Sequence, residues 1–206
     1  MNTGSIMCSH TGGIHMTLHD LYTGERTYRR FLPKEISHDT LLAVMENVRL
    51  AHCAGNMQKL RFAVVTEPEL RDKMAQQVHY AAYLPKEIGQ PKPGEEAMAY
   101  VVIIRPKDKY PLGDIDAGIA AEVITSSAWE QGIGSCMMLN FDAAKVNELL
   151  QVPEECTARM VIAMGYPAHT STIVEMDEAH GVKYYVDDEV NYYVPKRALE
   201  DLVQWK

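Results

Sequence analysis

One small-sided helical stretch, DAGIAAEVITSSAWEQ at residues 116–131, decides the fold. Its apolar residues recur at helical spacing through Ile119, Val123 and Ile124, and Gly132 follows as a terminator. Most of the remaining positions are Gly, Ala or Ser, so neighbouring elements can approach the helix closely on more than one side. Such a helix is usually central or at an interface.

The segments on either side of this helix alternate irregularly between the 3.6-residue apolar spacing of helices and the apolar runs typical of strands. Strands are predicted at 60–65, 97–105, 158–164, 181–186 and 191–194, and helices at 37–51, 67–79, 142–150 and 198–205. The strand at 97–105 is apolar on both faces and is expected to be central. No regular βαβ repeat is present, which favours an α+β fold over a doubly wound sheet.

Length and composition indicate one ordinary globular domain. The chain has 206 residues, and we expect a flexible leader at 1–16 followed by a single domain at 17–206. The net charge of -8 and the lack of a basic stripe argue against a nucleic-acid partner. No apolar run is long enough to span a bilayer, and residues 1–16 do not resemble an export signal. Four scattered cysteines without a CxxC pair suggest reduced thiols, and so a cytoplasmic protein.

Two basic clusters stand out in this acidic chain. Three arginines fall within the hexad Arg26-Thr27-Tyr28-Arg29-Arg30-Phe31, and Pro195-Lys196-Arg197 lies near the other end. Guanidinium groups and a hydroxyl can satisfy a phosphate with charge-assisted hydrogen bonds. The two clusters could therefore close on one phosphorylated ligand. A solvated basic turn would explain either cluster alone equally well.

Two other kinds of site receive little support. Gly132-Ile133-Gly134 lacks the third glycine of a dinucleotide fingerprint and follows a helix, so a Rossmann site is not expected. Cys8, His10, His15 and His19 could be imagined as zinc ligands, but they lie mostly in the leader without the spacing of a closed site. We predict no metal site.

Taken in order, several segments resemble motifs of the FMN-dependent nitroreductase family. The hexad resembles the family's R-S-x-R-x-F opening. The other matching segments are Asn56-Met57-Gln58 for N-x-Q, Asp116–Glu122 for D-x-G-I-A-x-Q, Gly132–Cys136 for G-L-G, Gly165-Tyr166-Pro167 for G-Y-P, and Pro195-Lys196-Arg197 for the C-terminal basic pair. The resemblance covers nearly everything from Leu21 onward. It implies a mostly antiparallel central sheet flanked by helices, in an intertwined homodimer.

The resemblance also implies which residues bind FMN. These are Arg26, Thr27, Tyr28, Arg29, Asn56, Gln58, Met137, Met138, Leu139, Asn140, Lys196 and Arg197. The first arginines and the C-terminal pair would hold the phosphate, the ribityl chain and the pyrimidine edge. The amide of Asn56 would meet the ring, and the backbone of residues 137–140 would pass flavin N5. No catalytic side chain is expected, because the cofactor carries the hydride chemistry.

The implied activity is a ping-pong oxidoreductase. Hydride would come from NAD(P)H and pass to an electron-poor acceptor such as a nitroaromatic or a quinone. The alternatives are another acceptor (an enone, a halogenated aromatic or ferric ion), or a flavin-binding carrier or sensor without turnover. Several positions depart from the family pattern, namely Glu25 for Arg, Glu122 for Gln, His52-Cys53 for Pro-Ser and Lys59-Leu60 for Pro-Trp.

Overall fold

A four-stranded antiparallel sheet forms the centre of the protein, whose computed structural model describes residues 16–108 and 111–206. The strand order is β1–β2–β4–β3, and each neighbouring pair runs antiparallel. The strands are β1 (Arg61–Val65), β2 (Ala99–Pro106), β3 (Gly134–Met138) and β4 (Cys156–Gly165). The expected α+β class and the central position of β2 are confirmed.

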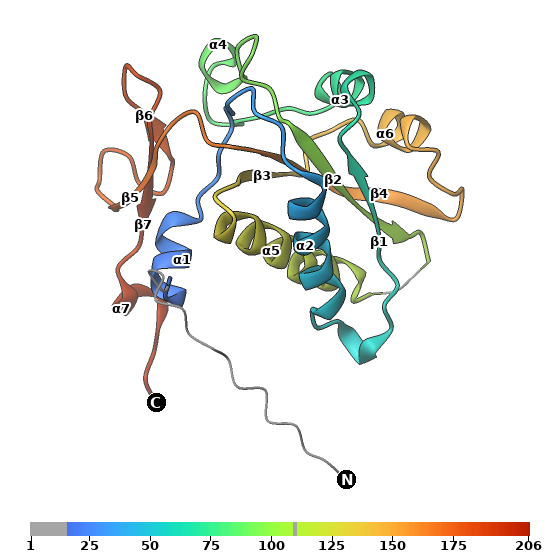
Figure 1. Ribbon diagram of the computed structural model, residues 1–206. Coiled ribbons are helices and arrows are strands. Elements are labelled where there is room, and N and C mark those ends of the chain that lie inside the picture. The colour runs from blue at the N-terminus through green and yellow to red at the C-terminus, as the bar shows by residue number, and fades with distance from the viewer. Residues whose placement is uncertain (1–15, 109–110) are drawn as a thin grey trace, which may run out of the picture.

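Helices cover both faces of this sheet (Figure 1). On one face lie α2 (His38–Leu50) and α5 (Gly113–Glu130), and on the other lie α3 (Pro68–Ala75), α4 (Lys86–Gly89) and α6 (Ala143–Leu149). The remaining short helices are α1 (Leu18–Gly24), the 3₁₀ turn η1 (Ala54–Asn56) and α7 (Leu199–Leu202). No helix in the described residues is long and apolar enough to cross a membrane.

The side chains of β2 alternate between two hydrophobic clusters because successive residues of a strand point to opposite faces. Tyr100 and Val102 join the cluster beneath α3 and α6, whereas Val101 and Ile103 join the cluster beneath α2 and α5. The small residues of α5 let it pack closely, and Ala121 is fully buried against the second cluster. The close approach predicted for this small-sided helix is thereby confirmed, while the side that carries Gly118 and Glu122 is exposed.

A second, smaller sheet is formed near the C-terminal end of the chain. It has the order β5–β7–β6, with β5 (Ser171–Glu175) parallel to β7 (Tyr192–Lys196) and β6 (Tyr185–Val186) antiparallel to β7. β5 contacts α1, so this sheet lies against the start of the described chain, on the left in Figure 1. The protein thus brings the two basic clusters into the same region.

Several local predictions were wrong. The spacing of Leu41, Leu42, Met45 and Val48 predicts the buried face of α2, but Leu42 is 59% exposed and Val44 is buried instead. Thr66 and Glu69 have the spacing of a capping box, but α3 is capped by the carboxylate of Glu67, which accepts from the backbone N–H groups of Glu69 and Leu70. The predicted helix at 198–205 is limited to the four residues of α7. The strands β3 and β5 and the helix α1 were not predicted.

Candidate functional site

The basic hexad is fixed to the central sheet through β3. The backbone N–H of Tyr28 donates to the Ser135 carbonyl at 2.8 Å, and Thr27 forms a parallel bridge with the same residue. Two glycines of the expected motifs make room for its rings. A Cβ on Gly134 would stand 2.7 Å from the Tyr28 ring, and one on Gly165 would stand 2.6 Å from Phe31. The second glycine of the G-x-G segment and the glycine of G-Y-P therefore serve close packing of the hexad.

Arg26 and Thr27 line a cavity of about 200 Å³ between the hexad, α5 and β3. The other lining residues are Tyr22, Glu25, Glu122, Thr125, Ser135 and Met137. One Arg26 nitrogen, Nη2, donates to the Tyr22 carbonyl at 2.7 Å, whereas Nε is buried without a hydrogen-bond partner. A guanidinium with an unused donor, in a cavity that Thr27 and Ser135 also line, suits an anion such as a phosphate.

Two carboxylates share this cavity. Glu25 accepts hydrogen bonds from the hydroxyls of Thr125 and Ser126, the latter at 2.6 Å. Glu122 lies one turn earlier on α5, and its Oε1 is 3.3 Å from the Ser126 hydroxyl. Partial burial and the nearby charge of Glu25 raise the pKa of Glu122. The acidic residues that replace the family's Arg and Gln thus meet at one place, which sequence separation had concealed.

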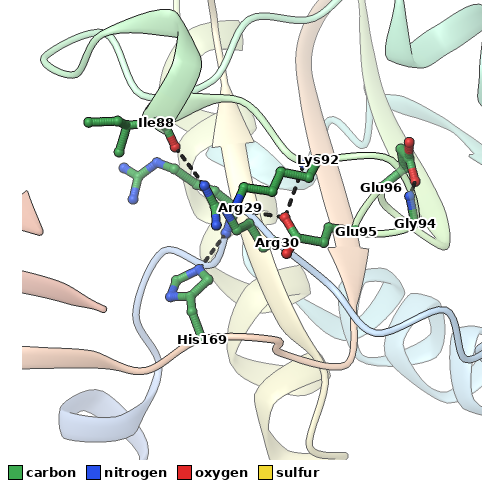
Figure 2. A network of polar contacts seen from close by, with 8 residues as sticks. All are labelled: Arg29, Arg30, Ile88, Lys92, Gly94, Glu95, Glu96 and His169. Carbon is green, nitrogen blue, oxygen red and sulfur yellow. Dashed lines mark hydrogen bonds and ion pairs between the residues drawn. The ribbon is translucent and has the colours of Figure 1, made fainter. Parts of the chain in front are cut away.

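The second and third arginines of the hexad point elsewhere. The Arg29 guanidinium carbon lies over the rings of Tyr184 and Tyr192, 4.5 and 4.7 Å from their centroids. Arg30 donates to the Ile88 carbonyl at 3.0 Å and forms an ion pair with Glu95 at 3.4 Å (Figure 2). Both arginines are more than nine-tenths buried. They tie the hexad to the C-terminal sheet and to the loop before β2.

His169 holds the backbone of the hexad in place (Figure 2). Its Nε2 accepts the Arg29 backbone N–H at 3.0 Å, and its Nδ1 lies 2.8 Å from the Thr170 carbonyl. This arrangement requires the neutral ring, with the proton on Nδ1. Burial lowers the pKa of His169, with a smaller contribution from the positive charge of Arg29.

Tyr28 is a core residue in this structure. It is 5% exposed, its ring stacks on Trp129 with centroids 5.2 Å apart, and its hydroxyl donates to the Gly24 carbonyl. Met138 is also buried, at 4% exposure, because β3 alternates inward and outward. Met137, on the opposite side of that strand, is 40% exposed and reaches the cavity. Leu139 and Asn140 follow the end of β3 and are exposed.

Asn56 and Gln58 lie away from the cavity. The Gln58 amide donates to Asn56 Oδ1 at 3.2 Å, within the turn that follows α2. The backbone N–H of Ala54 in this turn donates to Asp116 near the start of α5, whereas Glu25 is held by Thr125 near its end. These contacts are nine residues apart on α5, which is about 14 Å along a helix. One chain therefore does not bring all of the predicted cofactor residues together.

The C-terminal pair Lys196-Arg197 lies at the end of β7. Lys196 is paired in register with Glu175 of β5, and both basic residues are exposed. The candidate zinc ligands Cys8, His10 and His15 fall outside the described residues. Within residues 16–108 and 111–206 no group of three or more His, Cys, Asp or Glu is placed to hold a metal ion.

Comparison with known proteins identifies the family. The Nitroreductase family model matches residues 23–166. A protein of Archaeoglobus fulgidus named as an NADH dehydrogenase/NAD(P)H nitroreductase is 29% identical over 165 residues, covering 77% of this chain and 89% of the relative.

Solved structures share the fold. A nitroreductase family protein from Clostridium difficile superposes with a TM-score of 0.67 at 18% identity, covering 93% of this chain and 99% of the other. An FMN-dependent nitroreductase from the same species gives a TM-score of 0.62 at 23% identity, covering 74% and 88%.

The chain therefore belongs to the nitroreductase family. It is an NAD(P)H-dependent oxidoreductase, and the family, the fold class and the flavoprotein character expected from the sequence are confirmed.

Proposed function

We propose that the protein binds FMN with the phosphate in the cavity lined by Arg26, Thr27 and Ser135. The supporting observation is the buried Arg26 Nε, which has no hydrogen-bond partner although Arg26 lines the cavity together with the hydroxyl-bearing residues Thr27 and Ser135. A buried donor left unpaired costs free energy, and a phosphate oxygen would satisfy it. Lys196 and Arg197 would approach the same ligand from β7, because the small sheet packs against α1.

The proposed cofactor site is completed by a second copy of the chain. A cavity of about 200 Å³ is below the usual range for a ligand of this size, about 300–1,000 Å³. Asn56 and Gln58 lie toward the other end of α5, and the side of α5 that carries Ile115, Gly118 and Glu122 is exposed. In a homodimer that pairs this helix face, the amides of one chain would complete the site of the other.

When bound, FMN supplies the redox chemistry, taking hydride from NAD(P)H and passing it to an electron-poor acceptor such as a nitroaromatic or a quinone. The chain's own residues position and shield the cofactor. Arg26 and Arg197 would hold its phosphate, and the exposed apolar side chains of Met137 and Leu139 would border its ring. Because the donor and the acceptor would occupy one site in turn, we propose a ping-pong sequence.

Reconstitution and steady-state kinetics test this proposal. The purified protein, incubated with FMN and with FAD in separate samples, should retain about one FMN per chain after desalting. Initial rates of NAD(P)H oxidation at several quinone or nitroaromatic concentrations should give parallel double-reciprocal lines. Retention of FAD alone, or of no flavin, would overturn the cofactor assignment. Intersecting lines would overturn the ping-pong sequence, and flavin binding without turnover would favour a carrier or sensor.

A further inference from the structure

The cavity proposed for the phosphate carries an excess of negative charge. Arg26 is its only Lys or Arg among the described lining residues, and it faces the carboxylates of both Glu25 and Glu122. A phosphate brings a further charge of about -1.5 to -2 at neutral pH. Like charges brought together in a partly desolvated site disfavour each other's ionised form. The pocket can hold a phosphate more easily if one of the carboxylates takes up a proton.

The hydrogen bonds identify which carboxylate would take it. Glu25 accepts from two hydroxyl groups, those of Thr125 and Ser126, one on each of its carboxylate oxygens. Ser126 has a single hydroxyl proton, and its shorter contact, at 2.6 Å, is to Glu25. The 3.3 Å contact from the Ser126 oxygen to Glu122 is then favourable when Glu122 is protonated and donates.

The surroundings of Glu122 also favour its protonated form. Partial burial raises its pKa most and the charge of Glu25 raises it further, whereas Arg26 lowers it, as a hydrogen bond donated by Ser126 would. The segment from α1 to the hexad presents Tyr22, Glu25 and Arg26 to the cavity, and β3 presents Ser135 and Met137, neither of which titrates. Glu25 and Arg26 are thus the charged groups that these two elements place around Glu122.

We infer that binding of the FMN phosphate in this cavity, beside the carboxylates of Glu25 and Glu122, is coupled to uptake of one proton by Glu122. This inference rests on the proposed function, because it takes the cavity to be the phosphate site. Its consequence is a cofactor affinity that falls as the pH rises, beyond the change caused by the phosphate's own ionisation. Riboflavin, which lacks the phosphate, would bind without this coupling.

Calorimetric titration of the apoprotein with FMN and with riboflavin tests the inference. Titrations at several pH values between about 5.5 and 8.5, in pairs of buffers with different ionisation enthalpies, report both the Kd and the protons taken up. The variants are Glu122→Gln, whose amide has the charge and donor capacity of the protonated acid, and Glu130→Gln. Glu130 is an exposed residue about two turns later on α5 and does not line the cavity, so it is the matched control.

We expect the wild type and E130Q to take up a proton on binding FMN, and E122Q to lose that uptake. Relative to E122Q, the wild-type Kd for FMN should rise by up to about tenfold per pH unit over the range in which free Glu122 ionises. That range begins above the ordinary value of 4.5, because the pKa of Glu122 is raised.

The outcomes separate this inference from the proposed function. Tight FMN binding with the same pH dependence and proton uptake in the wild type and E122Q would overturn the coupling and leave the cofactor site standing. An equal proton uptake with riboflavin would also overturn it, because the phosphate would then not be responsible. Binding of neither flavin at any pH would overturn the proposed function and the coupling together.

Discussion

The ring of Tyr28 occupies the space that a side chain on Gly134 would need, with its carbons 2.7 Å from the position of a Cβ. The contact joins the basic hexad to β3, which also accepts the Tyr28 backbone N–H through Ser135. Gly165 stands in the same relation to Phe31. The spacing of these aromatic residues and glycines therefore fixes the hexad on β3, where Arg26 and Thr27 line the cavity.

Gly134→Ala should destabilise the protein by about 1–3 kcal/mol, because the added methyl group overpacks the site against Tyr28 and Pro167. Urea denaturation of both proteins measures the difference. In a Tyr28→Leu background the cost of Gly134→Ala should shrink, because the smaller side chain leaves room. The prediction fails if Gly134→Ala matches the wild type, or if its cost is the same in both backgrounds.

The sequence predicted those features that depend on local periodicity. The central strand β2 and the helix α5 were recognised because their apolar spacing is regular over many residues. The strand β3 was not recognised, because GSCMM contains small residues and reads as a turn. Its strand conformation is stabilised by pairing with β4, a contact between distant residues that local propensity does not report.

In the candidate site, too, residues were recognised from local motifs, whereas contacts between distant residues were not. Arg26 and Thr27 line the cavity that we propose for the phosphate, whereas Arg29 was predicted at a flavin edge and lies against Tyr184 and Tyr192 near the C-terminal sheet. The role of Arg29 at the flavin stays a prediction. The carboxylate pair of Glu25 and Glu122 was unpredictable, since the two residues are far apart in sequence and meet only when α1 packs on α5.

Arg29→Met should loosen the C-terminal sheet. The guanidinium interacts with the faces of Tyr184 and Tyr192, and a buried cation–π contact is worth about 0.5–2 kcal/mol. Hydrogen–deuterium exchange should therefore become faster in β6 and β7 but remain unchanged in β2. Arg197→Met removes the same charge at an exposed position and is the control. Equal protection of β7 in wild type and Arg29→Met would contradict the packing role.

His169 should make the protein less stable in mild acid. Its pKa is lowered in the folded state, so the unfolded chain binds the proton first as the pH falls below the ordinary value of 6.5. Stability is therefore lost on acidification, by at most about 1.4 kcal/mol per pH unit. His169→Gln cannot take up this proton, and its unfolding free energy should change less between pH 7.5 and 5.5. Identical pH profiles would show that His169 does not contribute.

Arg197→Ala should weaken FMN binding about ten- to a hundredfold, equivalent to losing one charged hydrogen-bond partner at about 1.5–3 kcal/mol. The effect should lie toward the upper end, because Glu25 stands where the family pattern has another arginine. Fluorescence titration with FMN measures the affinity, and Lys206→Ala serves as a control with the same loss of charge. Equal affinities for Arg197→Ala and wild type would remove this residue from the phosphate site.

Gly118→Leu should separate the proposed dimer without unfolding the chain. A Cβ on Gly118 meets nothing within 4 Å in one chain, so the larger side chain has room there. In a homodimer that pairs the exposed faces of α5, the same side chain would hold the two helices apart. Light scattering should therefore show a dimer for the wild type and a monomer for Gly118→Leu, with unchanged circular dichroism. Ala144→Leu, an exposed position on α6 across the sheet, should remain dimeric. A dimeric Gly118→Leu would place the interface elsewhere, and a monomeric wild type that binds FMN fully would refute the shared site.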